Sequence, residues 1–547
     1  MDDAKIMTYD RIRKLALLVV PGIVCLIGGF CLHALAPVYS APYYWYNLVS
    51  ADPAYVYLFN GLSILFGVAP GHVDHPGTPL QLFVAFIILV KSALSGTGTS
   101  DAMKEILADP EASIAMLGVF LLAGNALATW FLGVRIMRAT GSVALAVGAQ
   151  TGPMYLGYLL PRLTYLAPEA FLLAIATVLI GVLSSRLFGR EDDPVPTRDA
   201  IIAGILAGLG ITTKLTFAPL FGLLLLLGPN RRLALSGLAS IIAAAIFLLP
   251  IYGSLPFLWK WIWDLASHKG HYGAGEIGLM NWSELPNHLR FTWMGVPIVY
   301  FGLAASVIAF VIAIYNHRRF SRRTGNVLAL LFFAAPMSLV FATQFFIVMK
   351  HFLLQYLSPI VPLSTVAIVW LFWLACARIE TARLRRYANG AVAIVLFSAG
   401  VWYNAITLAQ VHAASLEKDA DRNTLDALLA KYPGANVVGT YTVPEINFAI
   451  HFGLTYTRPD FSNMANAILR NSFSIYGDNL FRPGSGPDTG FFDLSRLNDF
   501  ISGGQRFLAV FPKQIPFKRL ECAEPIVVLR YEHVCSIVKV LPREESK

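Results

Sequence analysis

The chain has 547 residues, of which 56% are hydrophobic and 14% are charged, and its formal net charge is +9. Its many apolar runs approach the ~20 residues that cross a bilayer as a helix, which excludes an ordinary soluble protein. The excess charge lies before about residue 411, where 27 Lys and Arg face 18 Asp and Glu, so it is attributed to membrane-flanking basic residues and no nucleic acid partner is expected.

Eleven apolar segments are predicted to span the membrane. They lie at 14–36, 112–137, 141–160, 168–187, 199–212, 215–229, 232–252, 292–315, 326–348, 353–377 and 389–410. The first follows several basic residues and lacks a small-residue cleavage site, so it is predicted to be an uncleaved helix. A further segment, 79–94, has only sixteen residues and is predicted to be an interfacial or re-entrant helix that does not cross.

The positions of the basic residues favour this count. If 79–94 does not cross, 19 Lys and Arg of the membrane half face the cytoplasm and 8 face outward. If it did cross, every later basic cluster would face outward, against the positive-inside tendency. The chain is therefore expected to be a multi-pass inner-membrane protein with a cytoplasmic N-terminus. Three regions are then outside, namely outer loop 1 at 37–111, residues 253–291, and everything after 410.

The last of these regions differs in composition from the rest. An amphipathic stretch at 412–431 precedes short β-rich runs such as "NVVGTYT", "RFLAVFP" and "PIVVLRY". This pattern predicts a soluble, periplasmic or extracytoplasmic α/β domain at 411–547 beside an all-α membrane domain at 1–410. Cys522 and Cys535 could form a disulfide if this segment lies in an oxidising compartment.

Outer loop 1 carries two groups of polar residues. Asp52 precedes a proline in "DPAYVYLF", a pattern typical of a helix N-cap, and it is also a candidate general base. Asp74 and His75 lie in the tight turn "HVDHPGTP". Together with His72 they could bind a divalent metal ion, although three such residues within one turn are a weak signal.

Other ionisable residues fall on the same side of the membrane. Glu169 lies near Arg162 in "PRLTYLAPEAF", Lys214 interrupts two apolar segments, and Lys350 and His351 open "KHFLLQYLSPIVPL". An ionisable group within a membrane segment is a functional candidate by default. The alternatives are that Glu169 only complements a helix dipole and that Lys214 snorkels to the interface.

Carboxylates beside cations at a membrane surface indicate a particular chemistry. A carboxylate can act as general base toward a hydroxyl, and cations can hold a phosphate and stabilise the charge that develops as it leaves. Such a site suits a donor whose phosphate is attached to a lipid.

Over residues 10–410 the chain resembles the membrane-embedded glycosyltransferases of the C-type fold (GT-C), which use polyprenyl-phosphate sugars. They include lipid A aminoarabinose transferase and the protein O-mannosyltransferases. The resemblance rests on Asp52, "VDHPGTPLQLF", "PRLTYLAPEAF", "GLGITTKLTFAPL" and "KHFLLQYLSPIVPL". It implies a juxtamembrane helix after the proline-rich turn, Asp52 as catalytic base, and Glu169 as a second acidic residue near donor or metal. His75 replaces the usual Lys of the turn, and Glu169 stands where Asp is common.

The expected function is an inverting glycosyl transfer from a polyprenyl-phosphate donor to an extracytoplasmic acceptor, which could be lipid A of the lipopolysaccharide, another glycolipid, a polysaccharide or a protein. Membrane lipids are the other expected partners. The candidates for phosphate binding are Arg162, Lys214, His75, Lys350 and His351.

Two questions stay open at this stage. A divalent cation, Mg, Mn, Ca or Zn, could be held by Asp74 and His75 or could bridge Asp52, Glu169 or His75. A transporter or flippase of lipid-linked sugars is the alternative function, but transporters often have repeated halves, and this chain shows one interrupted segment, near Lys214. A third alternative is a receptor or scaffold whose tail binds a partner.

Overall fold

A computed structural model describes most of the membrane domain, in residues 15–35, 54–73, 77–188, 195–270, 273, 275–320, 327–376, 379 and 381–432. Of the remaining chain it describes 436–439, 450, 453–466, 472–476, 479–481, 491–493, 497–512, 520–522, 527–528 and 532–540. Asp52, Asp74 and His75 lie outside the described residues.

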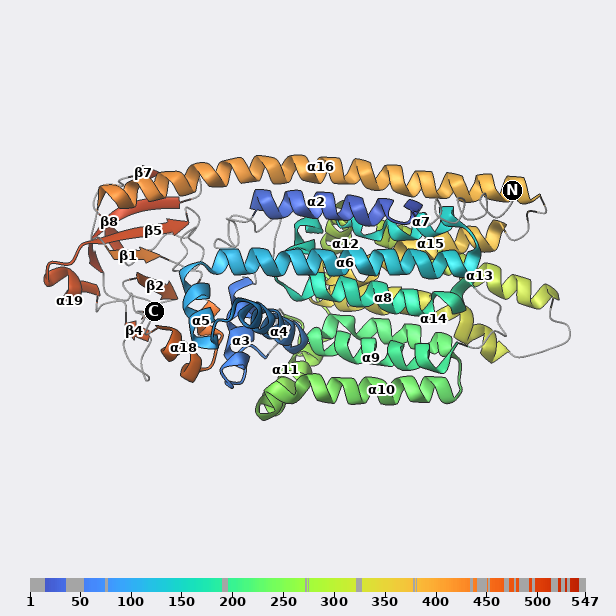
Figure 1. Cartoon of the computed structure of the whole chain (residues 1–547), viewed down its shortest axis with the longest axis horizontal. Coiled ribbons are helices and arrows are strands. Elements are labelled where there is room, and N and C mark those ends of the chain that lie inside the picture. The colour runs from blue at the N-terminus through green and yellow to red at the C-terminus, as the bar shows by residue number, and fades with distance from the viewer. Residues whose placement is uncertain are drawn as a thin grey trace.

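Long helices lie lengthwise beside one another in Figure 1 and form the membrane bundle. They include α2 (Val19–Leu35), α6 (Pro110–Thr140), α8 (Pro168–Phe188), α9 (Thr197–Thr213), α10 (Arg231–Leu248), α13 (Ile298–Phe320), α14 (Val327–Lys350), α15 (Val361–Cys376) and α16 (Ala382–Lys431). The sequence sets their limits locally. In α6, for example, the Asp109 side chain accepts a hydrogen bond from Ala112 N at 3.0 Å, and Gly141 ends the helix with φ +68°.

Fewer helices than predicted meet the length and apolarity of a membrane span. Within the described residues there are six such helices, or seven if α12 (Leu285–Gly295) and α13, which are bent by 99°, form one span. The count of eleven is therefore not confirmed. Two of the predicted spans contain long stretches that are not α-helical.

The predicted span at 141–160 is α-helical only in α7 (Val143–Gln150) and continues as the 3₁₀ turns η3 (Gly152–Tyr155) and η4 (Gly157–Leu163). The predicted span at 215–229 is the 3₁₀ segment η5 (Leu215–Leu227). Prolines inside η4 and η5 remove backbone donors, which favours tighter turns over continuous α-helix. Apolarity alone predicted both segments as spans and does not detect this effect.

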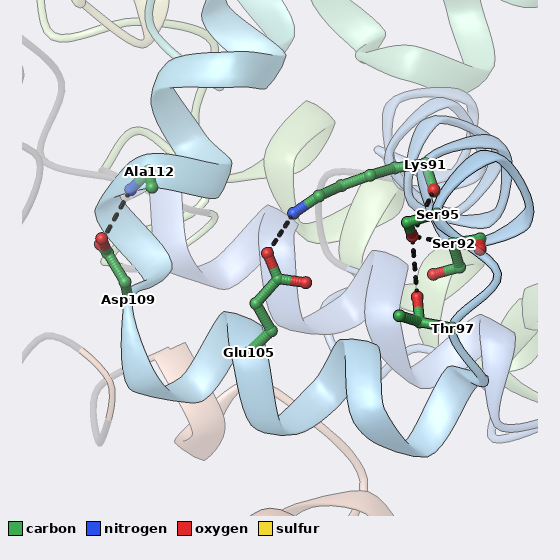
Figure 2. A network of polar contacts seen from close by, with 7 residues as sticks. All are labelled: Lys91, Ser92, Ser95, Thr97, Glu105, Asp109 and Ala112. Atoms are coloured by element: carbon green, nitrogen blue, oxygen red, sulfur yellow. Dashed lines mark hydrogen bonds and ion pairs between the residues drawn. The ribbon is translucent and has the colours of Figure 1, made fainter.

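The segment predicted as a juxtamembrane helix is α4 (Thr78–Ser95). Its length and composition are sufficient to span a membrane, yet Figure 1 shows it nearly end-on, so it runs crosswise to α6 and α8. Lys91 Nζ joins it to Glu105 Oε1 of α5 (Thr99–Ala108) at 2.7 Å, as Figure 2 shows. That α4 does not cross the membrane stays a prediction.

Besides α5, three shorter helices lie wholly or mainly in the predicted outer regions before the tail. They are α3 (Ala54–Leu65) in outer loop 1, and α11 (Leu255–Ser267) and α12 between the bundle helices. The turn η6 (Leu249–Ser254) joins α10 to α11. Trp259 and Trp263 of α11 are exposed, which is typical of aromatic side chains at a membrane interface.

The described part of the C-terminal tail contains a mixed sheet and two short helices. The strands are β1 (Asn436–Gly439), β2 (Ser472–Tyr476), β3 (Asn479–Phe481), β4 (Phe491–Asp493), β5 (Phe507–Pro512), β6 (Leu520–Cys522), β7 (Val527–Val528) and β8 (Glu532–Val540), and the helices are α18 (Pro459–Asn466) and α19 (Leu497–Ser502). The strand order is β4-β3-β2-β1-β5-β8-β6, with β7 also paired to β8. β1 is parallel to β2 and β5, and the other pairs are antiparallel.

The strand register bears on the two tail cysteines. Cys522 of β6 lies opposite Ile537, and Cys535 is two positions before Ile537 along β8. Because strand residues alternate faces, Cys535 and Ile537 lie on the same face. A disulfide between the cysteines stays a prediction.

The helix α16 connects the two parts of the chain without a break. The amphipathic stretch 412–431 continues the apolar stretch 389–410 as one helix of 50 residues, so the predicted domain boundary at 410/411 lies inside it. Ser415 Oγ donates to Ala34 O of α2 at 2.8 Å. In Figure 1 the strands lie at one end of α16, and α7 and the start of α16 lie toward the other end of the bundle.

Residues 453–466 of the tail, here called the docking segment, pack against outer loop 1. A Cβ at Gly453 would lie 2.8 Å from both the Tyr55 and Phe59 side chains of α3, and one at Gly71 would lie 2.5 Å from Tyr456 O. The ring centroids of Phe66 and Phe461 are 6.1 Å apart, and Phe461 is fully buried. The docking segment therefore packs closely against both α3 and the turn that follows it.

Candidate active site

The three ionisable residues at the centre of the site come from points where helices begin or end. Glu169 follows Pro168 in the first turn of α8, and Arg162 lies in the 3₁₀ segment η4 just before it. Lys214 follows α9 in an extended conformation, with φ −162° and ψ 138°. The extended residue ends α9 and starts η5, as the interruption at Thr212-Thr213-Lys214 predicted.

These side chains form one buried cluster, in which a carboxylate lies between two cations. Lys214 Nζ is 2.7 Å from Glu169 Oε1, and Arg162 Nη1 is 3.4 Å from Glu169 Oε2. Arg162 Nη2 also donates to Gln355 Oε1 at 2.8 Å, which connects the cluster to η8 (Leu354–Ile360). The Lys214 ammonium lies 4.7 Å from the centre of the Tyr356 ring, within the range of a cation–π contact.

The cluster has an excess positive charge. The side chains of Arg162, Glu169 and Lys214 are at most 4% exposed. Among the residues that the structure describes, Glu169 is the only acid paired with the two cations. A buried charge without a counter-ion is costly. The site is therefore suited to an anion that supplies the missing negative charge.

Lys214 also lines a cavity of about 290 Å³. Tyr356, Lys350 and His351 line it as well, together with apolar residues of α11, α14 and η5 and with Leu279. Lys350 Nζ donates to Ala266 O, and His351 Nε2 is 2.9 Å from Leu265 O, so both residues contact α11. The cavity thus combines cationic groups with a mainly apolar wall.

Outer loop 1 reaches the same cluster through two backbone contacts. Ala54, two residues after Asp52, donates its N–H to Tyr165 Oη at 3.1 Å, and Tyr165 lies between Arg162 and Glu169 in sequence. Gly77, two residues after His75, donates its N–H to Thr213 O at 3.0 Å, next to Lys214. The chain segments that flank the undescribed residues of the loop are therefore held by residues that are close in sequence to those of the cluster.

Two buried amides shape the turn between these contacts. Asn60 Oδ1 accepts from the N–H groups of Gly71 at 2.8 Å and His72 at 3.2 Å. Gln81 Nε2 of α4 donates to His72 O at 3.1 Å. Asn60 and Gln81 are both fully buried. The turn is thus fixed between α3 and α4 by polar contacts that the apolar pattern of these helices did not predict.

His72, a weak metal-ligand candidate, lies between two aromatic rings in the structure. Its ring centroid is 5.4 Å from those of Tyr57 and Tyr456, both at steep angles. His72 is 5% exposed. These contacts indicate a packing role in the interface between outer loop 1 and the docking segment.

The described residues do not fit a divalent ion. No group of three or more His, Cys, Asp or Glu among them is arranged to hold a metal. Both oxygens of Glu169 already face cations, which would repel a metal ion. Asp52, Asp74 and His75, which were predicted as possible ligands, lie outside the described residues.

The structure brings together five of the predicted site residues, with Arg162, Glu169 and Lys214 in the cluster and Lys350 and His351 at the adjoining cavity. The sequence did not single out Tyr165, Gln355, Tyr356, Asn60 or Gln81 as site residues. Tyr165, Gln355 and Tyr356 nevertheless lie inside the quoted motifs "PRLTYLAPEAF" and "KHFLLQYLSPIVPL". A polar residue within each apolar motif was the signal that could have identified them.

No family model matches the chain, and no curated protein matches it. The solved structures that are similar to it include two crystal structures of ArnT from Cupriavidus metallidurans, one bound to undecaprenyl phosphate and one in the apo state. The bound form has a TM-score of 0.48 and the apo form 0.49. Each is 12% identical in sequence and covers 94% of this chain and 98% of its own. At these values the likeness assigns no activity to the chain.

Proposed function

We propose that the chain is an integral-membrane glycosyltransferase that moves a sugar from a polyprenyl-phosphate donor to an acceptor hydroxyl on the outer side. One observation carries this proposal, namely the buried cluster of two cations and one carboxylate whose lysine lines a mainly apolar cavity. A sugar phosphodiester of a polyprenol has one negative charge, which would balance the excess positive charge of the cluster. Its isoprenoid chain suits the apolar cavity wall.

The cations would act most strongly as the donor breaks apart. When the bond between the anomeric carbon and the phosphate oxygen breaks, both bonding electrons stay with the polyprenyl phosphate, which gains a second negative charge. Lys214 lines the cavity, and Lys350 and His351 lie across it. Fixed cations at the position where charge develops stabilise the transition state more than the ground state.

Glu169 then serves as a positioning residue. Its two oxygens face Lys214 and Arg162, and the fully buried side chain does not line the cavity of about 290 Å³. We assign to it the task of holding the Lys214 ammonium in one place, since an ion pair limits the rotamers of a long flexible side chain. The resemblance instead implies that Glu169 is a second acidic residue that lies near the donor or a metal.

Asp52 is the proposed general base. It would accept the proton of the acceptor hydroxyl while that oxygen forms a bond to the anomeric carbon, from the side opposite the departing phosphate. Such a single displacement inverts the anomeric configuration. The hydrogen bond from Ala54 N to Tyr165 Oη supports this assignment, because it ties the chain two residues after Asp52 to the segment between Arg162 and Glu169.

The test is to incubate purified protein with a panel of polyprenyl-phosphate sugars and measure the release of polyprenyl phosphate. Wild type should release it with at least one sugar, and Asp52→Asn should lose about 10²–10⁴-fold of the rate, the usual contribution of a general base. An Asn variant with full activity would remove Asp52 from this role.

The same assay tests the transporter alternative, which the interrupted helices around η4, η5 and η8 favour. A transporter moves the intact lipid-linked sugar between leaflets of a vesicle and releases no polyprenyl phosphate. Movement without release, across the whole panel and with acceptor lipids present, would replace the enzyme proposal with a transport function.

A further inference from the structure

A second cavity lies at the other end of the bundle from the tail. Its volume is about 510 Å³, and it is lined by the end of α6, the start of α7, the start of α16 and Ala16. Figure 1 shows these three helix ends at the same end of the bundle, opposite the strands. This is the basic end that the positive-inside tendency places in the cytoplasm, so the cavity is remote from the site proposed above and is independent of it.

The wall of this cavity offers hydrogen-bond donors. Ser142 caps α7, and its Oγ accepts from Leu145 N at 3.3 Å. Val143 and Ala144, the first two residues of α7, line the cavity. The first backbone N–H groups of a helix have no partner inside the helix, and they bind phosphate groups in many proteins.

A buried amide provides an independent indication of a ligand. Asn389 of α16 is 9% exposed and lines the cavity. Its Oδ1 is buried without a hydrogen-bond partner, and its Nδ2 has only a long contact of 3.5 Å to Ser142 Oγ. A buried polar atom left without a partner costs free energy. A ligand with a hydroxyl or amine beside its phosphate would satisfy this oxygen.

The charges at the cavity are all positive. Arg385 and Arg386 line it, and no acidic residue does among those the structure describes. Arg385 donates from Nη2 to Ile379 O at 3.0 Å, which leaves its other guanidinium donors for a ligand. Arginine binds phosphate through two parallel hydrogen bonds, which makes it well suited to such a site.

The surroundings of the cavity point to a lipid. Large apolar side chains are exposed at and just before the start of α2, including Leu18 and Val19, and along α16, including Leu384 and Ile394. Acyl chains could lie along this surface while the headgroup enters the cavity. Basic pockets between membrane helices on the cytoplasmic side are known to bind anionic headgroups.

We propose that this cavity binds the phosphate of an anionic phospholipid from the cytoplasmic leaflet, with Arg385, Arg386 and the start of α7 holding the phosphate and Asn389 accepting from a headgroup hydroxyl. Phosphatidylglycerol, which has one negative charge and two headgroup hydroxyls, fits this description.

The test compares lipid retention by wild type, the double variant Arg385→Ala/Arg386→Ala and the control Arg383→Ala, each purified and given equal phosphatidylglycerol and phosphatidylcholine. Native mass spectrometry counts the bound lipids. Wild type and Arg383→Ala should prefer phosphatidylglycerol, because Arg383 is a neighbour that does not line the cavity. The double variant should lose about tenfold or more of this preference, given ~1 kcal/mol for each basic residue near the headgroups. Equal preference in all three proteins would overturn the proposal.

Two further measurements complete the test, one on an Asn389 variant and one with inorganic phosphate as competitor. Asn389→Leu should lower the preference for phosphatidylglycerol over phosphatidic acid, which lacks the glycerol hydroxyls, and an unchanged ratio would remove Asn389 from the headgroup contact. Inorganic phosphate at millimolar concentration should leave the lipid bound. Complete displacement by inorganic phosphate would identify the cavity as a site for a soluble phosphate compound. Size-exclusion profiles that match wild type show that each variant is folded.

Discussion

The bundle contains straight, continuous helices, such as α6 and α10, and helices that are interrupted by the 3₁₀ segments η4, η5 and η8. The two kinds of segment differ in where their charged and polar residues lie. In α6 the basic residues Arg135 and Arg138 lie in the last two turns, and α10 has its two arginines at its first two positions. Arg162, Lys214 and Gln355 instead lie at or within the interruptions, in η4, before η5 and in η8. The polar groups of the cluster therefore come from the points where the α-helix begins or ends.

The membrane explains this difference. An α-helix satisfies its own backbone hydrogen bonds and can face lipid, whereas irregular backbone at membrane depth is tolerated only where protein surrounds it or where it lines a cavity. Lys214, Arg162 and Glu169 are almost fully buried, and Lys214 lines the cavity of about 290 Å³. The interruptions thus coincide with the part of the bundle that we propose binds the donor, and substitutions there should have larger effects than those on straight helices.

The largest effect is expected for Glu169→Gln. This change leaves Lys214 and Arg162 buried without a counter-ion, so the free energy of unfolding should fall by about 3–5 kcal/mol and transfer should be lost. The double variant Glu169→Gln/Lys214→Met removes one cation as well and should regain much of the stability without regaining transfer. Denaturation in detergent and the polyprenyl phosphate assay measure the two quantities. Transfer by the double variant would contradict the proposed role of Lys214.

A smaller effect is expected for Gln355→Leu. The amide accepts from Arg162 Nη2 at 2.8 Å inside the protein, and hydrogen bonds to charged groups contribute about 1.5–3 kcal/mol. Stability should therefore fall by about 2 kcal/mol. Gln355→Glu, which keeps the acceptor and adds a negative charge beside Arg162, should be more stable than Gln355→Leu in the same denaturation experiment. The reverse order would argue against this hydrogen bond.

Gly71→Ala tests the contact between outer loop 1 and the docking segment. The added Cβ would lie 2.5 Å from Tyr456 O, so the turn must move and stability should fall by about 1 kcal/mol. Transfer should fall by at least about tenfold, because small displacements of catalytic groups are costly to rate. Gly98→Ala is the matched control, since nothing lies within 4 Å of its Cβ position. Equal rates for both variants would show that the contact does not position the loop.

The smallest effect is expected on a straight helix. Ile241 of α10 is 69% exposed, and its surroundings in the membrane are lipid. Ile241→Ala in reconstituted protein should change the free energy of unfolding by less than about 0.5 kcal/mol and leave transfer unchanged. A clear loss of activity would mean that α10 contacts a substrate or a partner through this face, which would weaken the distinction between the two kinds of segment.

The sequence predicted the interruption at Lys214 because a charged residue and two threonines divide two apolar runs. It did not predict the 3₁₀ turns at 152–160, because the residues of the predicted span at 141–160 are as apolar as those of a spanning helix. Hydrophobic periodicity reports burial and not the local effect of a proline. The same limitation applies to η5, which contains Pro219 and lies in the predicted span at 215–229.

For the site, the residue types in the motifs were sufficient to select Glu169, Arg162 and Lys214, since ionisable side chains are rare in apolar segments. Their pairing was not predictable from sequence, because Arg162 and Gln355 are 193 residues apart and meet only through packing of η4 against η8. Nor did the sequence show that both oxygens of Glu169 would face cations. That arrangement depends on the conformation of Lys214 between α9 and η5.

The unbroken helix α16 has a consequence for how the tail is oriented. A helix turns by about 100° and rises by 1.5 Å for each residue, so its length in residues sets both the height and the rotational phase of the sheet above the membrane. One residue inserted after Leu416 would turn the sheet by about 100° and separate Arg458 Nη2 from Ser254 Oγ, now 2.7 Å apart. Seven inserted residues would restore the phase to within about 20° but raise the sheet by about 10 Å. The number of residues in α16 therefore sets how the tail is rotated relative to the bundle. A longer α16 would require matching changes in the tail surface and in the bundle surface that contact each other.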